Sequence, residues 1–137
     1  MTYDIISTRK IKTIRIKKPD DIYNCLKRYA KNEQEYFIVM TLNGKHEVIG
    51  THIASVGLVN KTIIHPREVF KHAIKDNASA IIISHNHPSG DTSPSIEDNE
   101  ITLRMKKAAD ILGINFLDHL IIGKNGYYSY GNENKLM

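Results

Sequence analysis

The sequence predicts an α/β domain in which helices flank a single mixed β-sheet. Runs of β-forming residues alternate along the 137 residues with stretches whose apolar side chains recur at helical spacing. One run, Ala-Ile-Ile-Ile at residues 80–83, is continuously apolar, as expected for a central strand that is covered on both faces. Strands and helices that alternate within one short chain are typical of a sheet with helices packed against it.

Turn and cap residues place the individual elements. Asn43-Gly44 is a strong hairpin signal between two β-forming runs. Pro66 suits the first position of a helix, and Gly113 suits the end of one. The predicted elements are an edge strand within 9–18, a helix at 19–30, strands at 36–42 and 45–53, a helix at 66–77, a strand at 80–84, a helix at 95–112, and strands at 116–122 and 127–130.

Size and composition indicate one ordinary globular domain. We expect it to span residues 1–137, with residues 1–18 as a basic N-terminal strand segment. The apolar fraction of 41% and the charged fraction of 25% are usual for a globular protein. The single cysteine, Cys25, excludes an intramolecular disulfide and zinc sites built from several thiolates. No apolar run reaches membrane-spanning length and no signal peptide is recognisable, so we expect a cytoplasmic protein.

The net charge of +4 is mild, and much of the basic excess lies within residues 9–18. There Ile alternates with Lys and Arg, which favours an edge strand whose charged outer face discourages unwanted pairing. The alternative is a surface for nucleic acid or another acidic partner, because such partners favour clustered Lys and Arg.

The segment SHNHPSGDTSPSIED, residues 84–98, carries the residues that point to chemistry. His85 and His87 are two residues apart, so on a strand both project from the same face and reach one metal ion. Pro88 has no N–H to donate and ends the strand. The alternative is a polar loop in which the two histidines are neighbours without a shared role.

Ser95 and Asp98 have the spacing of a capping box at the start of a helix. The predicted inward stripe of this helix comprises Ile101, Met105, Ala108 and Leu112. Asp98 lies one helical step before the stripe, so its carboxylate is expected to face inward, where an unpaired charge is costly. A metal held by the two histidines would compensate the carboxylate, and a nearby Arg or Lys is the alternative.

Two histidines and one carboxylate are a common ligand set for a catalytic zinc that keeps a fourth position open. His119 is the alternative fourth ligand, although a lone strand histidine is more often a core or surface residue that Asp118 could hydrogen-bond. Zinc nucleobase deaminases need a P-C-x-x-C motif, and helical metalloproteases need H-E-x-x-H. Both motifs are absent from the sequence.

The spacing of His85, His87, Ser95 and Asp98 resembles the JAMM metalloprotease motif of JAB/MPN domains. HNHPSG at residues 85–90 is more narrowly similar to the bacterial RadC family, as are HPREVFKHAI before it and LGINFLDHLIIG after it. The resemblance extends from about Ile22 to Tyr130. It implies the JAB/MPN, cytidine-deaminase-like architecture. RadC proteins often carry an N-terminal helix-hairpin-helix region, and this chain resembles the short members without it.

The resemblance also implies a site and an activity. Zn2+ would be held by His85, His87 and Asp98, with Ser95 stabilising the attacked carbonyl and Glu35 as general acid/base. Glu33 and Glu47 are the alternatives to Glu35. The implied function is a zinc-dependent metallohydrolase that cleaves a peptide or isopeptide bond in a protein or peptide substrate.

Two other functions remain open at this point. One is a DNA-associated accessory or interaction module of DNA repair with little or no protease activity, since the RadC family is associated with DNA repair by name. The other is an inactive scaffold, whose usual mark would be missing ligands. Edge strands near both chain ends also suggest a homodimer, and no membrane partner is expected.

Overall fold

The computed structural model describes residues 13–57 and 64–136. The described elements are α1 (Pro19–Leu26), the 3-10 helix η1 (Lys27–Lys31), β1 (Glu35–Leu42), β2 (Val48–Gly57), α2 (Pro66–Lys75), β3 (Ala80–Asn86), α3 (Ile96–Leu112), β4 (Asn115–Gly123) and β5 (Gly126–Ser129). None of the helices in these ranges has the length and apolarity needed to cross a bilayer.

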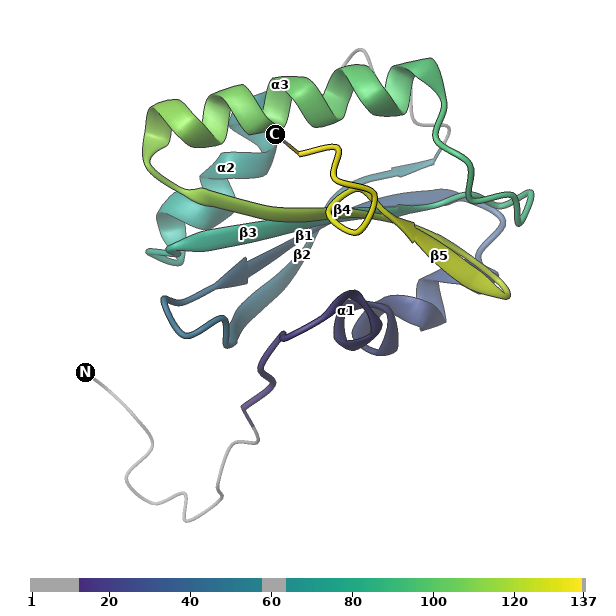
Figure 1. The fold of residues 1–137 in the computed structure, drawn as a ribbon, viewed down its shortest axis with the longest axis horizontal. Coiled ribbons are helices and arrows are strands. Elements are labelled where there is room, and N and C mark those ends of the chain that lie inside the picture. The colour runs from purple at the N-terminus through teal and green to yellow at the C-terminus, as the bar shows by residue number, and fades with distance from the viewer. Residues whose placement is uncertain (1–12, 58–63, 137) are drawn as a thin grey trace.

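The five strands form one mixed sheet in the order β2-β1-β3-β4-β5. β3 and β4 are parallel, and the other neighbouring pairs are antiparallel. Figure 1 shows α2 and α3 on one face of the sheet and α1 on the other. This arrangement confirms the predicted α/β class, with helices on both sides of a mixed sheet.

Strand alternation divides the core into two layers. Phe37 and Val39 of β1 pack with α2 and α3, whereas Ile38 and Met40 face the α1 side. Every residue of β3 is buried, including the polar ones at its end. The prediction of a central strand is therefore confirmed, and the strand extends two residues past the predicted 80–84, to Asn86.

The hairpin between β1 and β2 is present, but its turn is not the predicted two-residue Asn-Gly turn. The N–H of His46 donates to the carbonyl of Asn43 at 3.0 Å, and His46 itself has a φ of 62°. The N–H of Asn43 donates to the carbonyl of Glu47, so the loop comprises residues 44–46. A three-residue loop that ends in a left-handed residue is the next common hairpin type. The second strand therefore begins at Val48 and not at Lys45.

The basic N-terminal segment is only partly described. Residues 9–12 lie outside the described ranges, and within 13–18 the single β-interaction is an isolated antiparallel bridge between Arg15 and Glu47. The predicted strand is thus reduced to one bridge in its described part. Ile16 is buried, and its neighbours Lys17 and Lys18 are exposed, which agrees with a charged outer face.

Two helices differ from their predicted inward stripes near their C-terminal ends. On α3 the stripe includes Thr102 and Ala109, and Leu112 is 47% exposed. On α2 the predicted inward residue Ile74 is 65% exposed. The last buried residues of the two helices are Ala73 on α2 and Ala109 on α3, so each inward stripe ends before the last apolar residue of its helix.

Candidate metal centre

His85 and His87 lie together at the C-terminal end of β3. Their Nε2 atoms are 3.0 Å apart. The N–H of His87 donates to the carbonyl of Ile122 at 2.9 Å, so the ladder with β4 continues one residue past the strand and both imidazoles share a face. His85 is fully buried, and the His87 side chain is 13% exposed.

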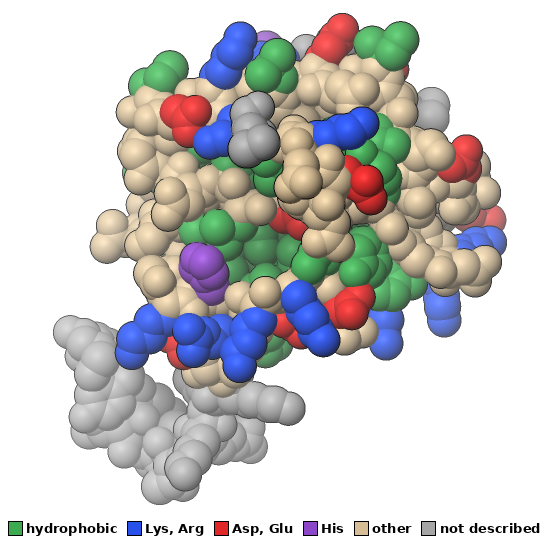
Figure 2. Space-filling model, viewed as in Figure 1, with side chains coloured by type: hydrophobic (Ala, Val, Ile, Leu, Met, Phe, Trp, Pro, Cys, Tyr) green, Lys and Arg blue, Asp and Glu red, His purple; other side chains and the backbone are tan. Residues whose placement is uncertain are grey.

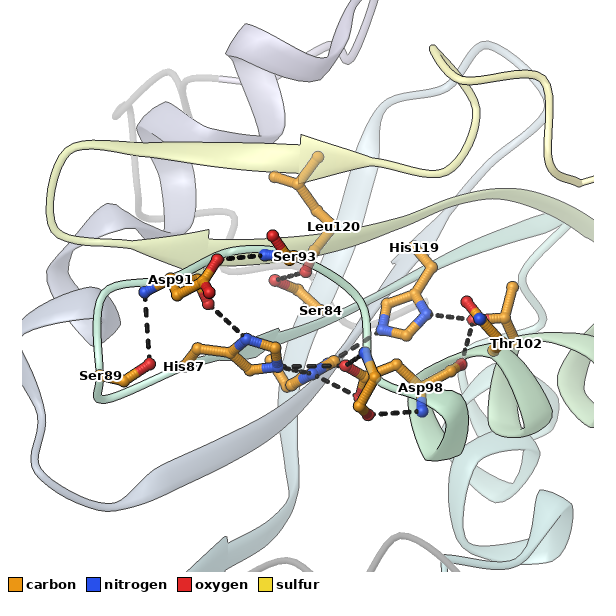
Figure 3. Close-up of polar contacts among 12 residues, drawn as sticks. Ser84, His87, Ser89, Asp91, Ser93, Asp98, Thr102, His119 and Leu120 are labelled. Atoms are coloured by element: carbon orange, nitrogen blue, oxygen red, sulfur yellow. Dashed lines mark hydrogen bonds and ion pairs between the residues drawn. The ribbon is translucent and has the colours of Figure 1, made fainter.

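Asp98, in the first turn of α3, points at both histidines. Its Oδ1 is 3.0 Å from His85 Nε2, and its Oδ2 is 3.1 Å from His87 Nε2. Figure 3 shows Asp98 beside the imidazole of His87, beneath the loop that follows β3. The side chain is completely buried, which confirms the inward position expected from helical spacing.

The capping box positions this carboxylate. Ser95 is the N-cap of α3, and its Oγ accepts the N–H of Asp98 at 3.0 Å. In return the N–H of Ser95 donates to Asp98 Oδ2 at 2.8 Å. The same two residues therefore start the helix and aim an acid at the histidine pair. The structural and chemical interpretations of this motif are compatible.

The spacing of these donors fits a tetrahedral metal ion. Ligand atoms about 2.0–2.1 Å from a tetrahedral zinc lie about 3.3–3.4 Å from one another. The closest contacts among His85, His87 and Asp98 are 3.0–3.1 Å, within a few tenths of an ångström of that separation. Two imidazole nitrogens and one carboxylate oxygen also suit zinc chemically.

His87 is held by the loop that follows it. Its Nδ1 lies 2.7 Å from the carbonyl oxygen of Asp91. A carbonyl can only accept, so Nδ1 carries the proton and the lone pair remains on Nε2. Asp91 is fixed in turn, because its Oδ1 accepts the N–H of Ser93 at 2.9 Å. That backbone bond is the main reason why the pKa of Asp91 is lowered.

Glu35 is the first residue of β1 and lies near the histidine pair. One of its carboxylate oxygens and one nitrogen of each histidine lie within 4.8 Å of one another. Glu35 is thus a second carboxylate at the centre, in addition to Asp98. Glu47 lies beyond the far end of β1, where it accepts the side-chain N–H of Asn43 at 2.8 Å.

A cavity of about 320 Å³ opens beside Glu35. It is lined by Glu33, Gln34, Glu35, Gly57 and Pro88. Pro88 directly follows His87 in the chain. The cavity therefore lies between the start of β1, the end of β2 and the loop after β3, and it shares Glu35 with the candidate centre.

Comparison with known proteins agrees with this arrangement. A family model described as the RadC-like JAB domain matches residues 16–136. The chain belongs to this family. The match includes the whole described sheet and every residue of the candidate centre.

Several proteins that are similar in sequence to this RadC-like JAB domain are named UPF0758 protein. One from Alkaliphilus metalliredigens is 54% identical over 125 residues, which cover 89% of this chain and 53% of the relative. Another from Alkaliphilus oremlandii is 47% identical, covering 95% of this chain and 56% of the relative. A third from Staphylococcus haemolyticus is 47% identical and is covered over 53% of its length. The chain thus spans about half the length of these relatives.

Asn86, between the two histidines, has a role in this JAB domain that the sequence interpretation missed. It faces the other side of β3, where its Oδ1 accepts the N–H of Tyr36 at 2.7 Å and its Nδ2 donates to the carbonyl of Gln34 at 3.0 Å. Both partners flank Glu35. The histidine strand therefore fixes the position of the approaching glutamate through its own central residue.

His119 was considered as a spare ligand, but it lies behind His85. Its Nε2 is 2.9 Å from His85 Nδ1, on the ring edge away from the candidate centre, and its Nδ1 is 2.5 Å from the hydroxyl of Thr102. The Asp118 carboxylate accepts the backbone N–H of His119 at 2.8 Å, the N–H of Gly131 at 2.9 Å and the hydroxyl of Ser129. Asp118 therefore does hydrogen-bond His119, as considered from the sequence, and the bond uses the backbone N–H of His119.

A β-bulge explains this orientation. The pairing of β3 with β4 shifts between Ile81 and Ile82, so Phe116 pairs with Ile81 but Asp118 pairs with Ile82. Simple alternation from Phe116 would put Asp118 on the α3 side and His119 on the α1 side. The extra residue exchanges them. A bulge of this kind leaves no mark in the hydrophobic pattern, so the position of His119 could not be deduced from it.

Proposed function

We propose that this RadC-like JAB domain is a zinc-dependent hydrolase of peptide or isopeptide bonds. The observation that carries the proposal is the convergence of His85, His87 and Asp98 at mutual distances of 3.0–3.1 Å. A second carboxylate, Glu35, borders the same point and also lines a cavity. This combination of a three-donor set, a nearby base and an open approach is typical of a catalytic and not a structural metal site.

His85, His87 and Asp98 would hold the metal. When bound, zinc supplies a Lewis acid that polarises a carbonyl and lowers the pKa of a water towards about 7. Two neutral imidazoles and one carboxylate leave the ion with net positive charge, which the Glu35 carboxylate offsets.

Glu35 is proposed to move the proton. In hydrolysis the water oxygen bonds to the carbonyl carbon, the C–N bond breaks, and the proton of the water ends on the leaving nitrogen. A carboxylate beside the reacting atoms accepts this proton and then delivers it. Glu35 suits the role because its carboxylate borders both histidines and the same residue lines the cavity.

Ser95 is proposed to donate to the carbonyl oxygen under attack. Its Oγ already accepts the N–H of Asp98, so the hydroxyl proton can be given to another oxygen. A donor held in place by a helix cap needs little reorganisation when charge develops on that oxygen. The backbone of α3 therefore orients both a metal donor and an oxyanion donor.

Metal analysis tests the first part of this proposal. After zinc loading and desalting, the native chain should retain about one zinc, and less than about half an equivalent would contradict a three-donor site. The His87→Ala variant should lose the metal. His52→Ala is the matched control, because the ring of His52 contacts Asp76 at 2.7 Å and not this centre. Retention of zinc by His87→Ala would place the metal elsewhere.

The exposed basic segment favours a second candidate, an accessory module that binds DNA. Arg15, Lys17 and Lys18 are exposed, and Figure 2 shows basic side chains in a row along the edge of the molecule beside α1. Binding to a duplex DNA probe should weaken steeply as salt is raised, and Lys17→Ser with Lys18→Ser should reduce the slope. A weak affinity that is independent of salt would eliminate this candidate.

A further inference from the structure

We propose that Thr102 and His119 are positioning residues that fix the proton of His85 on Nδ1 and keep its Nε2 available as a metal donor. The metal role rests on the proposed function. The hydrogen-bond relay itself is a property of the chain alone and can be tested without a metal. All three side chains are buried, His85 and His119 completely and Thr102 at 4% exposure.

The direction of the relay follows from Thr102. Its Oγ1 lies 2.7 Å from the carbonyl oxygen of Asp98 and 2.5 Å from Nδ1 of His119. Each of these short contacts requires a proton between the two atoms. The carbonyl has no proton to offer, so the single hydroxyl proton goes to Asp98. The proton in the other contact must then come from Nδ1 of His119.

The same reasoning carries on to His85. An imidazole in the tautomer that is protonated on Nδ1 has its lone pair on Nε2. That Nε2 lies 2.9 Å from Nδ1 of His85, so Nδ1 of His85 is the donor. His85 Nε2, which faces Asp98 and His87, is left with the lone pair that metal binding requires.

His85 needs such a relay because Asp98 competes for its proton. Asp98 Oδ1 is 3.0 Å from His85 Nε2, and a carboxylate at that distance attracts a proton to Nε2, which would block the nitrogen as a donor. His87 is protected by the carbonyl of Asp91. His85 lies in a strand that pairs on both sides, with Phe37 and with Ile121. The acceptor for its Nδ1–H is therefore a side chain of the neighbouring strand β4, that of His119.

Stacking holds the relay rigid. The ring of His119 stacks on Tyr130 with centroids 4.9 Å apart and planes 9° from parallel. The ring of His85 stacks at 6.1 Å on Phe37. Figure 3 shows His119 between Thr102 and the imidazoles of the centre. The rings therefore cannot rotate to exchange their nitrogens without disturbing the core.

Nitrogen-detected NMR of the imidazoles tests the relay directly. In the metal-free protein His119 should be neutral with its proton on Nδ1, and in the zinc-loaded protein His85 should be protonated on Nδ1. A proton on Nε2 of His119 would overturn the proposal. This measurement gives a result even if the native chain fails to bind zinc. A failure to bind zinc would contradict the proposed function. The direction of the relay would still be tested by the spectrum of His119 in the metal-free protein.

Zinc affinity, measured by competition with a chelator, tests what the relay does. Thr102→Val keeps the shape of the side chain and removes the hydroxyl, and the loss of an outer hydrogen-bond partner should lower the affinity about 10–100-fold. Thr102→Ser should restore most of it, which a purely steric role would not predict. His119→Leu should match Thr102→Val, with far-UV circular dichroism confirming the fold. Native affinity in both Thr102→Val and His119→Leu would overturn the proposal.

Discussion

Asn86 shows how one buried side chain links two parts of the centre. It accepts from Tyr36 and donates to Gln34 across the strand interface, while its neighbours on either side present their imidazoles to the opposite face. The residue therefore ties the segment that carries Glu35 to the strand that carries His85. Its substitution should disturb Glu35 more than the histidines.

The first prediction concerns Asn86→Ala. Removing a buried side chain that satisfies backbone groups costs about 1–3 kcal/mol, and the amide of Tyr36 should lose protection against hydrogen exchange. The matched control is Ser84→Ala, which removes a buried hydrogen bond to Leu120 from the same face of β3. Equal loss of Tyr36 protection in both variants would contradict a specific link.

The second prediction concerns Glu35→Gln, which keeps the shape of the side chain and removes its capacity to take a proton. We expect native zinc content and a loss of hydrolysis of at least about 100-fold, the usual contribution of a general base. The assay uses a library of fluorogenic peptides and a peptide with a Gly–Lys isopeptide bond. Glu33→Gln, which lines the same cavity, should stay within a few-fold of native activity. If Glu33→Gln lost activity and Glu35→Gln kept it, the roles would be exchanged.

Individual residues were predictable from sequence where spacing alone determines geometry. Two histidines two apart on a strand share a face, and an aspartate one helical step before a buried stripe points inward. Both inferences hold in the structure, with Asp98 fully buried beside the pair. Asn86, Thr102 and His119 were not predictable, because their roles depend on which strands and helices become neighbours.

At the scale of elements, the loop after β3 is pressed against the end of β4. A Cβ added to Gly123 would lie 2.8 Å from the carbonyl oxygen of Gly90 and 2.9 Å from a methyl carbon of Thr92. The first of these is a backbone atom that cannot rotate away. The loop therefore packs directly against Gly123. The same loop holds His87, because the carbonyl of Asp91 accepts from His87 Nδ1.

The third prediction follows for Gly123→Ala. The methyl group should displace the loop and weaken the bond between His87 and Asp91, so zinc affinity should fall about tenfold or more. Gly126→Ala is the matched control in the same hairpin, since a Cβ there meets nothing within 4 Å among the described atoms. Chelator competition on both variants checks the prediction, and equal affinities would show that the loop tolerates the displacement.

Element bounds were predicted best where a stereochemical signal exists. The N-cap Ser95 and the left-handed Gly113 bracket α3 as expected. The predicted hairpin turn was wrong and the bulge in β4 was not predicted, and both features involve an extra residue in a strand pair. An Asn-Gly pair permits a two-residue turn but does not enforce it, and here His46 takes the left-handed position.

At the scale of the whole molecule, the class of the fold followed from the alternation of element types, but the strand order did not. β3 occupies the centre of the sheet, between β1 and β4. The apolar run of β3 predicted that the strand is buried, but it did not predict which strands lie beside it. A single domain over 1–137 and a homodimer through edge strands stay predictions.

A second polar cluster lies at the C-terminal end of α2. Its protonation changes the stability of the whole molecule. The ring of His72 stacks on His52 at 4.4 Å, and its Nε2 is buried with no hydrogen-bond partner among the described residues. Burial, followed by the nearby charge of His52, lowers the pKa of His72. A hydrogen bond from Thr41, followed by the bond to His52, lowers the pKa of Asp76.

The fourth prediction is a loss of stability on acidification that His72 controls in part. A histidine whose folded pKa lies below its unfolded value of 6.5 resists protonation in the folded state. The unfolded state therefore binds more protons as the pH falls below about 6.5, and stability drops. Asp76 matters only at lower pH, because a carboxylate with a lowered folded pKa loses its stabilising effect only below its unfolded value of 3.8.

The variant His72→Phe tests this prediction. It keeps a stacked ring that does not titrate, so its melting temperature should fall less than that of the native chain between about pH 7 and about pH 5. His65→Phe, at the N-cap of the same helix, is the control, and parallel pH profiles for the native chain and His72→Phe would contradict this role of His72.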